Sequence, residues 1–490
     1  MGIYIGHDKE KCKERNWMDK LVNIERTLDR WSKRNLTLFG KITVLKSLVM
    51  SSLIHNFSLL ETPDDIVKKL EKIMYDFVWD KKDRIKRNTV ISSVEDGGIS
   101  MIDVKSKVSS IKAGWIKRLK ENSKWSRILQ WYLEANALDI DYMLKMNVKK
   151  ESDCIIFDKI PTFYREVFLS FNACKTNKEM HLLNDSEYLS SPIMGNDLIR
   201  NKGKSIFLVN WLKSNIKYVK DLYDEAGNFI SEVQLLNRLH NKSNWIVEYA
   251  IVKRAVKKYS EMFKTEMAHF VNIKNVSHLV YNNRFHDIMT FKSRDYYNIM
   301  IEKRKKRSHM ESVWSREFHI LKHKDIWSSI YNRKVKQFPV RKIAEFNYKI
   351  LQNILYTGYK INKWNKKVSA YCYCGELETP KHLLFECNKI KCIWNILSGL
   401  LKTNVTLKNI VIGCDEYNST ARFINVCISI ISYIIYCTWV KCSYTGGIYE
   451  HVNIQIIVRD RLIFYGKILE NTSMYNDIGK RILQTIEHID

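Results

Sequence analysis

Three cysteines and one histidine with the spacing of metal ligands stand close together in the chain. Cys372, Cys374, His382 and Cys387 follow the pattern C-x-C-x7-H-x4-C. Zinc in structural sites takes four thiolate or imidazole donors at tetrahedral corners, and three cysteines with one histidine suffice. Gly375 follows the second cysteine, where the backbone must bend sharply around a metal. The spacing predicts one zinc ion held by these four side chains.

The predicted zinc site is of the structural kind. Four protein ligands fill a tetrahedral site and leave no position for a substrate or a water molecule. Cys392 is an alternative for the fourth ligand, and four unrelated side chains are the competing interpretation. We expect a helical turn between His382 and Cys387 to aim both side chains at the metal.

Charge and composition indicate the class of partner and of fold. The 490 residues include 81 Lys and Arg against 53 Asp and Glu, a net charge of +28. Such an excess favours a polyanionic partner, with RNA or DNA ahead of an anionic membrane surface, and no small-molecule substrate is expected.

Only 5 Pro and 17 Gly interrupt the chain, which predicts a mainly α-helical fold. The 11 cysteines, an odd number without a secretory signal, indicate the cytoplasm or the nucleus and no secretion.

Helical periodicity is clearest in the first 80 residues. Apolar side chains recur at helical spacing over residues 15–34, and Thr37 can cap a second helix that ends near Asn56. A third helix should begin at Asp64-Asp65 and end at Trp79. Short connections between these helices predict a compact helical subdomain.

Three further segments carry specific expectations. Asp96-Gly97-Gly98 is a turn signal and predicts a short hairpin. The dense charge run 302–307 is best explained as a solvated helix face, with a phosphate-binding patch or a nuclear-import signal as alternatives. Residues 423–440 are uncharged and long enough to span a membrane, but their polar side chains favour a buried helix, so we expect no membrane insertion.

The order of several motifs resembles the C-terminal half of the reverse transcriptase polyprotein of LINE-type, non-LTR retrotransposons. The stretch 31–41, WSKRNLTLFGK, resembles the W-x-x-R-x-L-S-L-x-G-[KR] stretch of that family's thumb. Phe77 and Trp79 resemble the family's F-x-W element, and residues 97–103 resemble its G-G-[LI]-x-x-x-[DN] element. Trp211 with residues 220–222 resembles the helical linker. Residues 378–387 with Trp394 resemble the zinc-binding segment. The family more often has C-x-x-C where this chain has C-x-C.

The resemblance implies a four-part organisation. It comprises a multi-helix thumb-like region over 1–120, a long helical linker over 121–310, a helical segment with a small CCHC zinc knuckle over 311–400, and a helical C-terminal segment over 401–490. The palm, the fingers and the endonuclease of the family would lie before Met1. The only Asp-Asp pair, Asp64-Asp65, is better explained as a helix start than as a polymerase metal clamp.

By resemblance the chain is a fragment that binds RNA or an RNA–DNA hybrid and is no enzyme by itself. The expected nucleic-acid contacts are basic side chains in and near the thumb-like region and an aromatic with lysines just before the knuckle: Arg34, Lys41, Lys46, Lys86, Arg87, Lys363, Trp364, Lys366 and Lys367. Ordinary surface charge, and a core position for the tryptophan, are the competing interpretations. An inert translated relic is the alternative function, and a nuclease using Asp139 and Asp141, or His286 and Asp287, is a further one.

Overall fold

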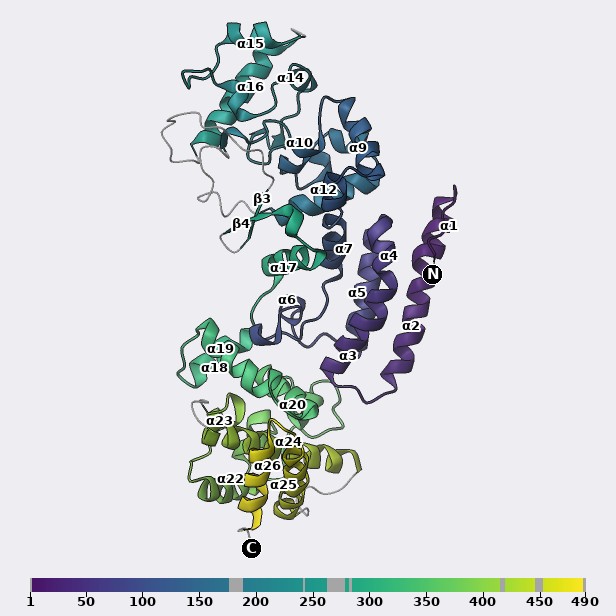
Figure 1. The fold of residues 1–490 in the computed structure, drawn as a ribbon. Coiled ribbons are helices and arrows are strands. Elements are labelled where there is room, and N and C mark those ends of the chain that lie inside the picture. The colour runs from purple at the N-terminus through teal and green to yellow at the C-terminus, as the bar shows by residue number, and fades with distance from the viewer. Residues whose placement is uncertain are drawn as a thin grey trace. The chain divides into compact units, whose positions relative to one another are not determined.

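A computed structural model describes residues 2–175, 188–240, 243–261, 278–281, 284–414, 419–445 and 453–487. Over these residues the chain is mainly α-helical, as predicted, with two short antiparallel strand pairs (Figure 1). The chain divides into two compact units that are each discontinuous in sequence. Unit 1 comprises 1–25, 47–73 and 102–304, and unit 2 comprises 26–46, 74–101 and 305–490. The four-part organisation expected from the sequence stays a prediction.

The elements of unit 1 are α1 (Lys9–Lys13), η1 (Glu14–Met18), α4 (Ser51–Leu59), α7 (Val104–Ala113), α8 (Ile116–Lys120), α9 (Lys124–Glu134), α10 (Ile140–Lys145), η4 (Glu151–Asp153), α11 (Ile156–Lys159), α12 (Thr162–Cys174), β1 (Arg200–Asn201), β2 (Lys204–Ser205), α14 (Val209–Lys213), η6 (Val219–Leu222), α15 (Glu232–Arg238), α16 (Trp245–Ser260), β3 (His278–Tyr281), β4 (Arg284–Asp287), η7 (Ile288–Thr290) and α17 (Ser293–Arg304).

Helix α7 is central to unit 1, because it packs against α4, α12 and α17. Its Lys112 is 1% exposed and forms an ion pair with Glu166 of α12 at 2.7 Å. A buried cation of this kind needs its partner, so the pair fixes the α7–α12 contact.

The elements of unit 2 are α3 (Leu38–Val44), α6 (Arg87–Val90), η3 (Val94–Asp96), α18 (His309–Glu317), α19 (Lys324–Tyr331), η8 (Asn332–Lys336), α20 (Arg341–Leu351), α21 (Gly358–Asn362), η9 (His382–Glu386), α22 (Asn388–Leu401), α23 (Leu407–Val411), α24 (Ser419–Thr445), α25 (Ile454–Glu470) and α26 (Asn476–Glu487). The chain passes between the units within α2 (Asp19–Ser32), η2 (Leu45–Met50) and α5 (Asp64–Trp79). Helix α24 packs against α20, α23 and α25.

Two helical stretches are long and apolar enough, by length and composition alone, to cross a membrane. They are Leu38–Leu59 and Ser419–Ser443. The apolar window of the second stretch is 72% buried within the protein, which agrees with the predicted buried helix at 423–440. Its polar side chains find partners there: Asn425 Oδ1 accepts the Cys414 N–H at 2.7 Å, and Ser432 Oγ donates to the Ile428 carbonyl at 2.8 Å.

The three N-terminal helices form where periodicity predicts them. Thr37 caps α3 by accepting the Gly40 N–H at 3.1 Å, and the continuous helical stretch ends at Leu59 rather than near Asn56. Helix α5 begins at Asp64 and ends at Trp79. The Asp64-Asp65 pair therefore starts a helix, as expected, and Asp65 pairs with Lys13 at 3.2 Å.

The hairpin predicted at Asp96-Gly97-Gly98 is wrong, although the turn is present. Gly97 adopts a φ of +84° after the 3-10 turn η3, and no strand flanks it among the described residues. A Cβ on Gly98 would lie 2.1 Å from the Ser92 carbonyl oxygen. The segment instead packs tightly against the end of α6, which leaves no room for a paired strand.

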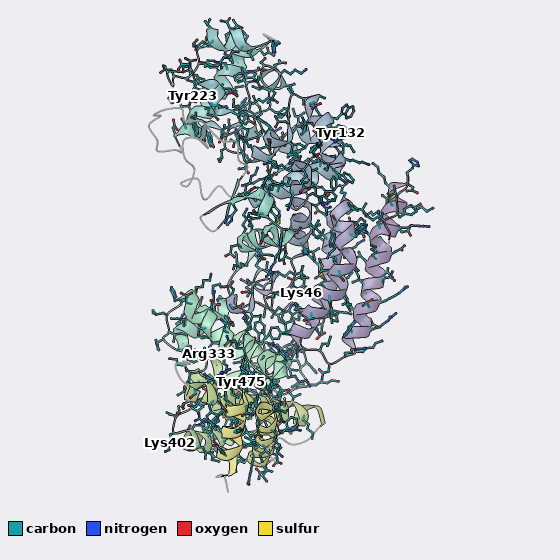
Figure 2. All side chains as sticks on the ribbon, viewed as in Figure 1. Lys46, Tyr132, Tyr223, Arg333, Lys402 and Tyr475 are labelled. Atoms are coloured by element: carbon teal, nitrogen blue, oxygen red, sulfur yellow. The ribbon has the colours of Figure 1, made fainter. Side chains whose placement is uncertain are left out.

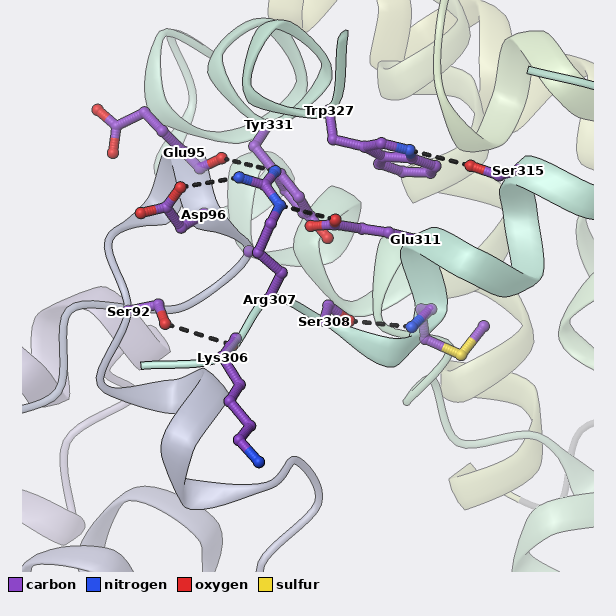
Figure 3. Close-up of polar contacts among 12 residues, drawn as sticks. Ser92, Glu95, Asp96, Lys306, Arg307, Ser308, Glu311, Ser315, Trp327 and Tyr331 are labelled. Carbon is purple, nitrogen blue, oxygen red and sulfur yellow. Dashed lines mark hydrogen bonds and ion pairs between the residues drawn. The ribbon is translucent and has the colours of Figure 1, made fainter. Parts of the chain in front are cut away.

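The charge run 302–307 is only in part the predicted solvated helix face: Glu302, Lys303 and Arg304 at the end of α17 are exposed, but Lys305 and Arg307 after the helix are engaged in ion pairs. Arg307 donates to Asp96 Oδ1 and to Glu311 Oε2, each at 2.8 Å (Figure 3). Lys305 also pairs with Asp96 at 2.8 Å. Burial alone would raise the pKa of Asp96, but these cations lower it. In unit 1 Arg304 pairs with Asp103 at 2.5 Å. The run holds loops and helix starts in place through ion pairs.

Candidate metal centre and basic surface

The four predicted ligands come together in unit 2. One ligand atom from each of Cys372, Cys374, His382 and Cys387 lies within 4.8 Å of all the others. Cys374 Sγ and His382 Nε2 are 3.2 Å apart. Zinc–sulfur and zinc–nitrogen bonds of about 2.3 and 2.0 Å require donor atoms within about 4 Å of one another. No pair of donor atoms exceeds that separation by more than about 1 Å, so the cluster is compatible with one metal ion.

A tight turn and a helix entrance position the four side chains. Gly375 adopts a φ of +87°, and its N–H donates to the Cys372 carbonyl at 2.9 Å, which closes the turn between the first two cysteines. His382 begins the π-helical turn η9, and its N–H is capped by Thr379 Oγ1 at 3.1 Å. Cys387 stands directly before α22, and its N–H donates to the His382 carbonyl at 3.0 Å. The expected helical turn between these two residues is present.

The thiols of the cluster are coupled by a shared hydrogen bond. The contact between Cys372 and Cys387 raises the pKa of Cys372 to about 12 and lowers the pKa of Cys387. A metal ion would bind these cysteines as thiolates.

The alternative ligand Cys392 lies outside the cluster. It sits within α22, where its Sγ donates to the Lys389 carbonyl at 3.1 Å, and Gln455 Nε2 donates to it at 3.5 Å. In the described part of the chain, one group of at least three Cys, His, Asp or Glu side chains has its ligand atoms together, and Cys392 is not in it.

A buried carboxylate ties the cluster to the rest of unit 2, and sequence reasoning missed it. Glu378 is 7% exposed; its Oε1 accepts the Gly358 N–H at 2.7 Å and its Oε2 accepts Trp439 Nε1 of α24 at 3.0 Å. Burial raises the pKa of Glu378, while the two donors favour the ionised form. The glutamate lies between the second and third predicted ligands, so it fixes the knuckle against α21 and α24.

The predicted contacts in the thumb-like stretch differ in accessibility. Arg34 is exposed and lies over the Trp31 ring at 4.5 Å. Lys46 is exposed on η2 (Figure 2). Lys41 is engaged instead: its side chain is 15% exposed, and Nζ lies 3.3 Å from both Asp80 Oδ1 and the Val78 carbonyl oxygen. Of these three cations, Lys41 is already neutralised by a partner.

The second predicted pair lies at the start of α6. Lys86 precedes the helix and is exposed. Arg87 pairs with Asp83 at 2.9 Å and stacks over Tyr75 at 4.1 Å. Lys86 has the more open position for a phosphate contact.

The predicted aromatic contact before the knuckle is a surface residue, not a core residue. Trp364 is 55% exposed and meets Tyr356 edge-on at 5.5 Å. Lys363, Lys366 and Lys367 beside it are exposed. Lys82 Nζ lies 5.5 Å from the Trp364 ring, which adds a cation from a distant part of the sequence.

A groove of about 470 Å³ lies in unit 2, and sequence reasoning did not find it. Its walls come from the stretch 35–41, from the end of α5 and the loop after it, from α20 and from α24. No local sequence pattern predicts this groove, because its basic and aromatic side chains come from four separated segments.

The acidic pairs weighed for a nuclease have structural partners. Asp139 caps α10 by accepting the Tyr142 N–H at 2.7 Å, and Asp141 lies 3.9 Å from Lys120. Asp287 accepts the Met289 N–H at 2.9 Å at the start of η7. Asp139 and Asp287 thus cap the start of an element, and Asp141 pairs with a lysine.

Comparison with known proteins relates the chain to transposon proteins. No protein-family model matches it. It aligns over 442 residues, 82% of its length, with "Transposon TX1 uncharacterized 149 kDa protein" of Xenopus laevis at 17% identity. Over 118 residues, 22% of its length, it is 25% identical to "Putative ribonuclease H protein At1g65750" of Arabidopsis thaliana. The alignments cover 33% and 19% of these relatives, so the chain spans a third or less of each. A distant relation to transposon proteins is thus shown.

Proposed function

We propose that the chain binds RNA or an RNA–DNA hybrid as the thumb, linker and zinc-binding part of a retrotransposon reverse transcriptase. The alignment with the Xenopus laevis transposon protein, which covers 82% of the chain, carries this proposal. The net charge of +28 supports it, because a phosphate backbone is the polyanion that such a charge favours. The chain does no chemistry by itself in this proposal.

The metal in this proposal is one structural zinc ion. Three thiolates and an imidazole form a donor set that suits zinc and leaves no coordination position open. Through Glu378 the zinc-bound segment holds α24, so the metal acts as a clip within unit 2.

The test is the salt dependence of binding by the full-length chain. A labelled RNA–DNA hybrid is titrated by fluorescence anisotropy between 50 and 200 mM salt. Six or more phosphate contacts predict a loss of affinity of about 1000-fold over this range, because counterions are released on binding. An affinity that stays constant over this range refutes the proposal and favours an inert relic. Cleavage of the hybrid on addition of Mg²⁺ that is lost in Asp139→Asn also refutes it, in favour of a nuclease.

A further inference from the structure

The groove in unit 2 carries more positive than negative charge. Five basic side chains line it, and two carboxylates oppose them, which leaves an excess of three positive charges. Lys349 pairs with Glu345 at 2.7 Å, and Lys41 pairs with Asp80 at 3.3 Å. Arg84 and Lys342 are among the cations that supply the excess. An anionic ligand fits this groove better than a neutral one.

Aromatic rings form part of the same groove. Tyr433 and Tyr436 of α24 lie 5.5 and 5.4 Å from the Phe346 ring of α20, and all three line it. Both tyrosines are partly exposed. A volume of about 470 Å³ lies at the lower end of the range of small-ligand sites, which suits one nucleotide.

Arg84 connects the groove to the exposed tryptophan. It lines the groove, and its guanidinium lies 4.3 Å over the Tyr356 ring. Tyr356 in turn contacts Trp364, and Lys82 lies beside that indole. Arg84 and the rings of Tyr356 and Trp364 therefore form a continuous series from the groove to Lys82. We call the groove and these four side chains the basic–aromatic track.

We propose that the basic–aromatic track binds an unpaired, single-stranded segment of RNA or DNA. Bases stack on Trp364 and on the groove tyrosines, and phosphates lie next to Arg84 and Lys342. A duplex keeps its base faces stacked inside, whereas a single strand offers them to aromatic side chains, and proteins that bind single strands combine such rings with a basic groove. This inference rests on the proposed function and deepens it by naming the strand state.

The experiment measures binding of three oligonucleotides of one sequence by the full-length chain over the same series of salt concentrations: single-stranded RNA, single-stranded DNA and an RNA–DNA hybrid. Trp364→Ala should weaken binding of both single strands about tenfold or more, as loss of one stacked base does, and leave hybrid binding within about twofold. Lys342→Gln should reduce the salt slope for single strands by about 0.7, because one phosphate contact is lost.

Matched controls come from unit 1. Trp131 is 69% exposed on α9, and Lys124 is exposed on the same helix. Trp131→Ala and Lys124→Gln should leave single-strand binding unchanged. Circular dichroism checks that Trp364→Ala is folded, as its 55% exposure predicts.

The outcomes separate the two proposals. Salt-dependent binding of the hybrid with single-strand affinity unchanged in Trp364→Ala and Lys342→Gln overturns the track and keeps the proposed function. Absence of salt-dependent binding to all three oligonucleotides overturns both. Weakening of the single strands in both track variants, with the controls unchanged, supports the track.

Discussion

The hydrogen bond between Trp439 and Glu378 should be a principal link between the metal centre and α24. Trp439→Phe removes the indole N–H that donates to Glu378 Oε2 at 3.0 Å and leaves the Gly358 N–H at 2.7 Å as the remaining donor. A hydrogen bond to a charged group contributes about 1.5–3 kcal/mol. Trp439 is 6% exposed, so the smaller ring also leaves a cavity that costs about 1 kcal/mol. The expected loss in the free energy of unfolding is therefore about 2.5–4 kcal/mol.

Urea unfolding of the zinc-loaded protein measures this loss. Trp364→Phe is the matched control, because that indole is 55% exposed and should change stability by less than about 0.5 kcal/mol. The hydrogen bond from Trp439 to Glu378 also holds the zinc-binding segment in place. A chelator should therefore remove the metal faster from Trp439→Phe than from the wild type. A variant as stable as the wild type, or one destabilised with unchanged metal release, would refute the reasoning.

Two further substitutions test the loop at 89–98 of unit 2. Gly98→Ala should destabilise the protein by about 3 kcal/mol, because the new Cβ would lie 2.1 Å from the Ser92 carbonyl oxygen and 2.5 Å from that of Thr89. Its control is Gly399→Ala in α22, where the added Cβ would meet no atom within 4 Å apart from the neighbouring residues and backbone of its own helix. This substitution should stabilise the protein by about 0.5–1 kcal/mol. Equal effects of the two substitutions in a thermal melt would contradict the close packing at Gly98. Asp96→Asn should cost about 1.5–3 kcal/mol at pH 7, since it weakens the contacts that its two cations make with the carboxylate. Those cations lower the pKa of Asp96, so the wild type should lose this advantage as the pH falls from 5 toward 2. A difference that persists at pH 2 in urea titrations would argue against the ion pairs.

The sequence was sufficient wherever a local signal determines the structure. Helical periodicity predicts α2 and α5, and the ligand spacing finds the cluster, because a short turn and one helix entrance bring its members together. The hairpin prediction failed because the Asp96–Gly98 turn is stabilised by contacts with residues 305–307, about 210 positions later. A turn signal contains no information about such partners.

Long-range pairing also explains what the sequence missed. Glu378 is an ordinary acidic residue in the sequence, and its role depends on Trp439, 61 positions away. The exposed state of Trp364 could not be separated from a core position by spacing. The groove combines four segments, so no window of sequence reveals it.

The zinc content of the purified protein is the most direct test of the metal centre at Cys372, Cys374, His382 and Cys387. Inductively coupled plasma mass spectrometry should find one zinc per chain in the wild type and in Cys392→Ser, whose thiol lies outside the cluster. Cys372→Ser should retain far less, because one of four donors is lost. A wild-type zinc content far below one per chain, or equal zinc in both variants, would contradict the account.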